Sequence, residues 1–404
     1  MHRLSSVVIL FFASSILCGA QGFFQFEKQT VRKSAVSLEW DVDLDYRFDN
    51  REFDASSEMY ASSETVHGVF LTPSVGVGIR GNGGVRHFVC AGIDLYRRMG
   101  LGEEGLQPLR EMTLYYDVHV RKEKYAFEGV AGCFPRQYLE GEYGPLYYDE
   151  KHAFLDRNLE GVLLKISRKS FYSELALDWM GVVGAQSHER FQILSYGDWK
   201  AASWLDLGWT GSFYHYACSQ ASPGVVDNHV LTPFVRFDLS EAVGIQTLSL
   251  KASGVASYQW DRKQGDPAGL FGGEFDLRAG HWNVTLGNRL YLGDDIQPMY
   301  GNTDLAGEIY GSMLYFGFPC YQAGVYDCAD LSWQPSLTPF LDLRLSLSFH
   351  FGDDGHEFLT YLGNMQSFSL IFNLDAFRSK DCVRGRAGSP APRKKTFRGP
   401  RMTL

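Results

Sequence analysis

The sequence lacks any apolar run long enough to cross a bilayer as a helix. Of its 404 residues 45% are hydrophobic, and its mean hydropathy is −0.18, whereas a membrane-spanning helix needs about 20 consecutive apolar residues. Cysteine is scarce as well. The seven cysteines form neither CxxC pairs nor the spacing of a zinc site. These absences exclude a bundle of transmembrane helices and a cysteine-based metal domain.

The chain also lacks the excess of positive charge that nucleic-acid binding needs. Lys and Arg number 38 against 47 Asp and Glu, which gives a formal net charge of −9. Many basic residues follow Arg378, so the preceding chain is more acidic than the total indicates. An acidic body argues against a nucleic-acid partner. The segment 378–404 is rich in Pro, Gly and Arg, and we expect it to be a disordered basic tail.

The first 20 residues have the pattern of a cleaved secretory signal. A short basic start, MHR, is followed by the apolar run SSVVILFFASSIL, and Cys18-Gly19-Ala20 supplies small residues at the cleavage site. A lipoprotein is the alternative, but Leu17 stands where a lipobox has a small residue before its cysteine. We therefore expect a signal peptide over 1–20, followed by an extended lead-in over 21–35.

A strict alternation of apolar and polar residues begins at Val36. In VSLEWDVDLDYRF (36–48) every even position is apolar and every odd position is polar, mostly charged. Successive side chains of a strand point to opposite faces, so this strand has one apolar face and one charged face. In a soluble sandwich the apolar face would be the core. In a membrane barrel it would meet lipid, and the acids would line a lumen.

The same alternation recurs in about sixteen segments, and their connections alternate in length. LDLRLSLSFHF (341–351) is a late example. Short connections are expected at 81–84, 122–124, 168–170, 198–202, 240–245, around 280 and at 334–336. Longer ones are expected at 49–67, 97–110, 135–160, 181–189, 218–228, 261–269, 293–320 and 352–363. Short connections at one end of the strands and long connections at the other end are typical of an outer-membrane barrel. A soluble sandwich has no reason to keep this alternation.

In these features residues 36–377 resemble Gram-negative outer-membrane β-barrels of the porin-like kind. The resemblance rests on strands such as VSLEWDVDLDYRF and LDLRLSLSFHF and carries no family-specific motif. It implies an all-β antiparallel barrel of about 16 strands in the outer membrane, with short periplasmic turns, long external loops and a periplasmic lead-in. It also implies contact with outer-membrane lipid and with the barrel-assembly machinery, and it leaves homo-oligomerisation open. Phe377 matches the aromatic end of such barrels, although a tail follows it here.

A barrel of this kind would place charged side chains of both signs in its lumen. We expect this set to comprise Glu39, Asp41, Asp43, Asp45, Arg47, Asp117, His119, Arg121, Lys165, Glu174, Asp178, Arg236, Lys251, Glu274, Asp276, Arg278, Arg289, Asp342 and Arg344. Such walls favour passive passage of small polar solutes or ions, with a preference for cations because the body is acidic. The alternative is a non-conducting barrel, plugged by its own paired charges, that binds surfaces or adheres through its external loops.

Neither a catalytic site nor a cofactor site is indicated. His67, His215, His229, His281 and His350 have Ser or Asp neighbours, but none has a diagnostic spacing. GVGIRG (76–81) satisfies G-x-G-x-x-G, yet another alternating strand follows it where a dinucleotide loop needs a helix. The acids of the first strand stand roughly 6–7 Å apart along one face, so they form a ladder and do not converge on a metal. We expect a non-enzyme without cofactor or metal.

Two further features leave alternatives open. The link 135–160 is rich in Tyr and acids, and it would fold into the pore as a constriction, lie outside as a recognition loop, or pack on an aromatic girdle. Cys320 and Cys328 are close in PCYQAGVYDC, where a loop-tightening disulfide competes with two separate small apolar residues.

Overall fold

A computed structural model describes residues 35–54, 61–100, 108–185, 187–217, 219, 224–263, 265–303, 310–338, 340–353 and 358–373. The expected signal peptide, the lead-in up to residue 34, the aromatic end at Phe377 and the basic tail lie outside the described residues. Within the described ranges, no helix is both long and apolar enough to cross a membrane.

Antiparallel strands make up most of the described chain, and the helices are short. The strands are β1 (Ala35–Phe53), β2 (Glu64–Arg80), β3 (Val85–Arg98), β4 (Leu109–Arg121), β5 (Ala126–Pro135), β6 (Asn158–Arg168), β7 (Phe171–Gly181), β8 (Glu189–Ala202), β9 (Leu205–Ala217), β10 (Val225–Asp238), β11 (Thr247–Asp261), β12 (Ala268–His281), β13 (Val284–Gly293), β14 (Val325–Trp333), β15 (Ser336–Thr338), β16 (Leu341–Gly352) and β17 (Thr360–Asn373). The helical turns are η1 (Asn82–Gly84), η3 (Arg136–Tyr138), α2 (Glu150–Leu155), α3 (Ser240–Val243), η4 (Gly311–Leu314) and η5 (Pro319–Gln322).

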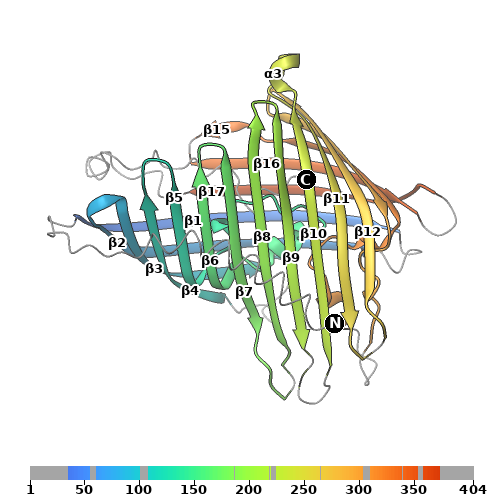
Figure 1. The fold of residues 1–404 in the computed structure, drawn as a ribbon, viewed down its shortest axis with the longest axis horizontal. Helices are drawn as coiled ribbons and strands as arrows, with labels where there is room; N and C mark the ends of the chain where they lie inside the picture. The colour runs from blue at the N-terminus through green and yellow to red at the C-terminus, as the bar shows by residue number, and fades with distance from the viewer. Residues whose placement is uncertain are drawn as a thin grey trace.

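The sheet closes on itself. Each strand pairs with its neighbour in sequence, and β1 pairs with both β2 and β17. The exception is β15, a short strand beside β16, because β14 pairs directly with β16. The remaining sixteen strands form a closed antiparallel barrel, which confirms the expected fold. The wall formed by β8–β12 crosses the wall formed by β1, β16 and β17 (Figure 1), as the strand tilt of a barrel requires.

The two faces of the sheet differ sharply in polarity, and β1 shows how. Val36 and Leu38 are 67% and 73% exposed on the outside, whereas Asp43 and Asp45 are each 8% exposed on the inside. The same period of two places apolar side chains outward on the other strands, among them Val77, Val89, Leu114, Phe275, Leu286 and Leu345. The barrel is therefore apolar outside and charged inside, the reverse of a soluble core.

Connections alternate between a short-turn end and a long-link end of the barrel. The short-turn end carries 81–84, 122–125, 169–170, 203–204, 239–246, 282–283 and 334–340, and the long-link end carries 54–63, 99–108, 136–157, 182–188, 218–224, 262–267, 294–324 and 353–359. β1 begins and β17 ends at the short-turn end, which α3 marks in Figure 1. One expected turn was wrong: 198–202 belongs to β8, because Trp199 pairs with Phe171 and Lys200 pairs with Asp206.

A glycine on β5 permits a close approach of two strands. Gly132 has φ 123°, and a Cβ added to it would lie 2.3 Å from the carbonyl oxygen of Leu114 on β4. Gly129 on the same strand has no such constraint, because a Cβ there would come no nearer than 3.4 Å to the Val118 side chain. The β4–β5 pairing therefore depends on glycine at position 132.

Gly132→Ala is expected to destabilise the barrel by roughly 1–3 kcal/mol, because alanine strains this backbone conformation and its methyl group meets backbone. Gly129→Ala is the matched control and should be neutral or slightly stabilising. Urea unfolding of the refolded barrel measures both. Equal stability of the two variants would contradict the proposed constraint.

Candidate functional site

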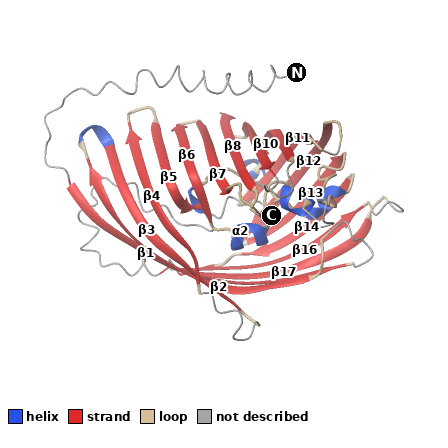
Figure 2. Cartoon of the chain, turned by 90° about the horizontal axis from the view of Figure 1, so that it is seen from below, coloured by secondary structure: helices blue, strands red, loops and turns tan. Residues whose placement is uncertain are grey.

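Two long links turn inward and occupy the barrel lumen. We call residues 136–157 the first lumenal loop and residues 294–303 and 310–324 the second lumenal loop. In the first, Leu139, Tyr143 and Tyr148 are 0–1% exposed. In the second, Tyr321 is completely buried. Figure 2 shows α2 of the first loop between the two walls of the sheet. The position of the first loop settles the alternatives left open for 135–160 in favour of the interior.

The two lumenal loops hold each other by backbone hydrogen bonds. The Asp149 N–H donates to the Phe316 carbonyl at 2.6 Å, and the Phe318 N–H donates to the Pro145 carbonyl at 2.7 Å. The Tyr148 and Phe316 rings stack with their centroids 6.2 Å apart. The loops therefore act as one body inside the barrel.

Arginines of the β1–β16 wall bind the acidic end of the first lumenal loop. Arg51 on β1 makes two hydrogen bonds to the Asp149 carboxylate, at 2.8 and 3.0 Å. Glu150 pairs with Arg47 on β1 and lies 3.9 Å from Arg344 on β16. Such bidentate and charge-assisted contacts are strong because both partners are ionised. They attach the loop to one wall.

The two loop carboxylates are held in their charged form. Burial would raise the pKa of Asp149, but the Arg51 guanidinium outweighs burial and the pKa lies below its ordinary value. Glu150 behaves in the same way, with Arg47 and Arg344 lowering its pKa against the effect of burial. A lowered pKa contributes stability above the ordinary carboxyl range of about 4, and that contribution is lost only as the pH falls through the lowered pKa.

The other end of the first lumenal loop is fixed to the β7–β10 wall. Glu174 on β7 accepts hydrogen bonds from the backbone N–H groups of Glu140 and Gly141, at 2.8 and 2.9 Å. The Tyr147 hydroxyl donates to the Thr210 carbonyl on β9 at 2.9 Å. Arg236 on β10 pairs with Glu142. The loop thus spans the lumen from one wall to the opposite one.

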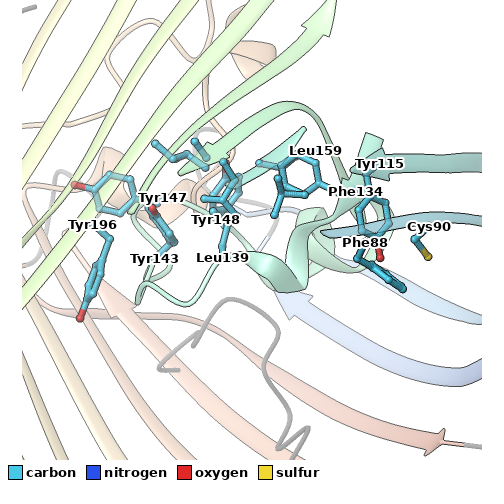
Figure 3. Packing of buried hydrophobic residues seen from close by; sticks show 14 of the residues in the cluster. Phe88, Cys90, Tyr115, Phe134, Leu139, Tyr143, Tyr147, Tyr148, Leu159 and Tyr196 are labelled. Carbon is cyan, nitrogen blue, oxygen red and sulfur yellow. The ribbon is translucent and has the colours of Figure 1, made fainter. Parts of the chain in front are cut away.

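An aromatic cluster packs the lumen around this loop. Figure 3 shows it extending from Tyr196 through Tyr143, Tyr147, Tyr148 and Leu139 to Leu159, Phe134, Tyr115 and Phe88. Side chains of the loop and of several strands contribute to it. Aromatic pairs with edge-to-face geometry, such as Tyr143 with Tyr148, add stability beyond the area that they bury.

The second lumenal loop is bound mainly by uncharged groups. The Tyr214 hydroxyl on β9 donates to the Met313 carbonyl at 3.1 Å, and the Asn228 amide on β10 donates to the Leu314 carbonyl at 3.0 Å. The Tyr315 hydroxyl donates to Gln259 on β11 at 2.6 Å. This loop fills the lumen beside β9–β11.

The expected lumenal residues of β1 become more buried along the strand from the short-turn end. Glu39 and Asp41 are partly exposed, whereas Asp43, Asp45 and Arg47 are 8–9% exposed. Asp45 pairs with Arg157, at the end of the first lumenal loop, at 2.6 Å. The ladder of acids therefore begins in a partly open vestibule and ends under the loop.

Several of the expected residues on other strands form paired groups. On β12 and β13, Arg278 and Arg289 bind Asp276 at 2.8 and 2.6 Å. Arg121 is exposed at the short-turn end of β4, and Asp117 on the same strand is 2% exposed. The structure brings Arg47 and Arg344 together on one acid, as described above, and keeps Arg236 on the opposite wall.

Cys320 and Cys328 do not form the disulfide that the sequence left open, and both residues are free thiols. Cys320 lies in η5 of the second lumenal loop, and Cys328 lies on β14 opposite Arg289 and His350. Both belong to one buried apolar cluster. They pack as separate small apolar side chains, which was the alternative interpretation of the sequence.

The sequence analysis did not single out Asp149, Glu150 or Arg51, which attach the first lumenal loop. A signal was present, since two adjacent acids of the link 135–160 complement arginines at odd, inward positions of the first strand. The inward turn of the second lumenal loop carried no comparable signal.

Comparisons with known proteins concern the fold. No protein-family model and no curated protein sequence matches the chain. In-vitro folded OmpT, an outer membrane protein of Vibrio cholerae, is 8% identical over 85% of this chain and 100% of its own, with a TM-score of 0.49. An anion-selective porin from Comamonas acidovorans is 10% identical over 85% and 100%, with a TM-score of 0.47. Acinetobacter baumannii OccAB3 is 10% identical over 84% and 99%, with a TM-score of 0.43. The barrel assignment rests on the chain's own strand pairing.

Asp149→Asn is expected to release the first lumenal loop from β1, because it removes one partner of a buried charge pair. Breaking such a pair costs about 3 kcal/mol or more, so amide exchange of residues 145–152 should accelerate roughly a hundredfold. Hydrogen–deuterium exchange measures this, with Asp266→Asn, at an exposed position between β11 and β12, as the control. Unchanged protection of the loop in Asp149→Asn would contradict the attachment.

Proposed function

We propose that this chain is an outer-membrane channel of the porin-like kind, constricted by its two lumenal loops. The observation that carries the proposal is the division of a closed sixteen-stranded sheet into an apolar outer face and a charged inner face. A soluble protein rarely exposes so extensive an apolar surface, whereas a bilayer requires one. Closure also satisfies the backbone polar groups of every strand, which lipid demands.

Aromatic side chains at the short-turn end support a membrane boundary there. Trp204 and Trp282 lie in short turns and are 51% and 78% exposed, and Trp199, Trp333 and Tyr125 are 41–50% exposed nearby. Tyr and Trp favour the level of the lipid headgroups because they combine an apolar ring with a polar group. We place the short-turn end in the periplasm and the long links outside the cell.

Leu114→Arg is expected to destabilise the barrel in a bilayer by about 2–4 kcal/mol, because Leu114 is exposed near the middle of β4. Val120→Arg is the matched control, because Val120 has the same parity as Leu114 but lies next to the last residue of β4, and it should cost only about 0–1 kcal/mol. Unfolding from lipid vesicles measures both variants. Equal effects at the two positions would contradict a membrane-facing surface.

The lumen favours polar solutes or ions, and the vestibule favours cations. Glu39 and Asp41 line the partly open short-turn end of β1. The first lumenal loop then crosses the lumen between charged walls, as porin-like constrictions do. Opposed acids and arginines orient polar solutes and resist apolar ones. We infer passive passage without a catalytic step, and a modest preference for cations.

One observation favours the alternative, a non-conducting barrel that acts through its external links. Inner charges such as Asp49, Arg51, Asp276 and Arg289 are 0–7% exposed and paired with one another or with the loops. Paired, buried charges fill a lumen and leave little room for water. Whether the barrel conducts or is plugged therefore depends on how far the first lumenal loop detaches from the strands that bind it.

Single-channel recording in planar bilayers tests the proposal. The refolded wild-type barrel should give discrete conductance steps, and Asp149→Asn/Glu150→Gln should give larger ones, because the freed loop no longer spans the lumen. Absence of steps from both proteins would reject the channel and favour the non-conducting alternative.

The same recordings under a salt gradient test selectivity. Glu39→Gln/Asp41→Asn should move the reversal potential toward that of an unselective pore, because it removes the acids of the vestibule. Asp266→Asn, in an external link, is the control and should leave the potential unchanged. If the double variant also leaves it unchanged, those acids do not face the conducting path.

A further inference from the structure

The hairpin of β4 and β5 brings a histidine and two carboxylates together on its lumenal face. Asp117 and His119 are two residues apart on β4, so their side chains point to the same side. Glu128 on β5 stands directly opposite His119 in the strand pairing. The three candidate ligand residues thus lie on two paired strands and not in a loop. The cluster lies close to the short turn 122–125.

The three side chains converge closely enough to share one ion. His119 Nε2 lies 3.1 Å from Asp117 Oδ2, and His119 Nδ1 lies 3.6 Å from Glu128 Oε2. One ligand atom from each residue lies within 4.8 Å of the other two. Zinc binds histidine nitrogen and carboxylate oxygen at about 2.0–2.2 Å, so small side-chain rotations bring all three within reach of one metal.

A second, independent observation points to a ligand at this place. Asp117 is 2% exposed, and its Oδ1 is buried without a hydrogen-bond partner, while Oδ2 is held by His119. A buried carboxylate oxygen without a partner is costly, and a bound water or ion is one way to satisfy it. The His119 side chain is 36% exposed, so an ion can reach the cluster from the lumen.

The local charge suits a divalent cation. Lys165 on β6 donates to Glu128 Oε1 at 3.1 Å and to Glu140 of the first lumenal loop at 3.2 Å. Three carboxylates and one ammonium leave two negative charges when His119 is neutral. Arg86 stands opposite His119 on β3, but its guanidinium binds Glu39 at 2.8 Å. The remaining charge of the cluster is therefore equal in size and opposite in sign to that of one divalent metal ion.

We propose that Asp117, His119 and Glu128 form a binding site for a divalent transition metal, of which Zn²⁺ is the probe. One imidazole nitrogen and two carboxylates match the ligands that zinc accepts, with a fourth position open to water from the lumen. The site would join β4 to β5. It would also be connected to the first lumenal loop, because Lys165 binds both Glu128 and Glu140. It does not depend on whether the barrel conducts.

Calorimetric titration of the refolded full chain with Zn²⁺, in detergent and without a histidine tag, tests the site. The wild-type barrel should bind one Zn²⁺ saturably. His119→Ala and Glu128→Gln should each weaken binding by at least the roughly 10- to 100-fold cost of losing an outer partner of a metal. The control is His215→Ala, because His215 lies 3.0 Å from Asp227 but belongs to no group of three converging ligands among the described residues, and it should bind as the wild type does.

Co²⁺ gives a direct readout of ligation. The wild-type barrel should develop visible ligand-field absorption with Co²⁺, and Glu128→Gln and His119→Ala should lose it while keeping the heat-dependent gel shift of a folded barrel. If one variant does not fold, the other decides the outcome. Absence of saturable Zn²⁺ binding by the wild type would overturn the proposal. Wild-type Zn²⁺ affinity together with a wild-type Co²⁺ spectrum in either folded variant would also overturn it.

Discussion

The pairing of β1 with β17 is the constraint on which the rest of the structure depends. Eleven residues of β1, from Asp43 to Phe53, stand opposite residues of β17. Without that pairing both strands would present unpaired edges, and the sheet would have no defined inside. Once the sheet is closed, its period of two assigns every strand residue to the outer or the inner face. Which face of each strand is apolar and which is polar then follows from the pairing of β1 with β17.

Closure also leaves charges of the wall in need of partners, and the first lumenal loop supplies some of them. It buries a row of charges on β1, and buried charges are unfavourable without partners. Some of those partners come from the wall itself, such as Asp49 for Arg51. Others have to come from the loop, as Asp149, Glu150 and Arg157 do. The first lumenal loop therefore supplies opposite charges to the buried charges of β1, and it also obstructs the lumen.

The sequence predicts the features that repeat and fails where long-range contacts decide. The alternation in VSLEWDVDLDYRF and the change between short and long connections were sufficient to predict the closed barrel. DWKAA (198–202) has the composition of a turn, yet it extends β8 because Trp199 and Lys200 find partners on β7 and β9. The inward turn of 294–303 and 310–324 depends on partners far away in sequence, such as Gln259 and Asn228, and no local sequence pattern predicts them. Cys320 and Cys328 are near in sequence but belong to a lumenal loop and a strand, each packed in apolar surroundings.

The position of Glu150 links the first lumenal loop to closure of the barrel. Its carboxylate pairs with Arg47 on β1 and lies near Arg344 on β16, and these two strands lie on either side of β17. The two arginines come together only after β17 has joined the first strand to the last ones. An open sheet would offer the loop one arginine, and a closed barrel offers both. Because each ionised partner strengthens the attachment of a buried acid, the loop is held best in the complete barrel. The same geometry that closes the wall thus positions the loop across the lumen.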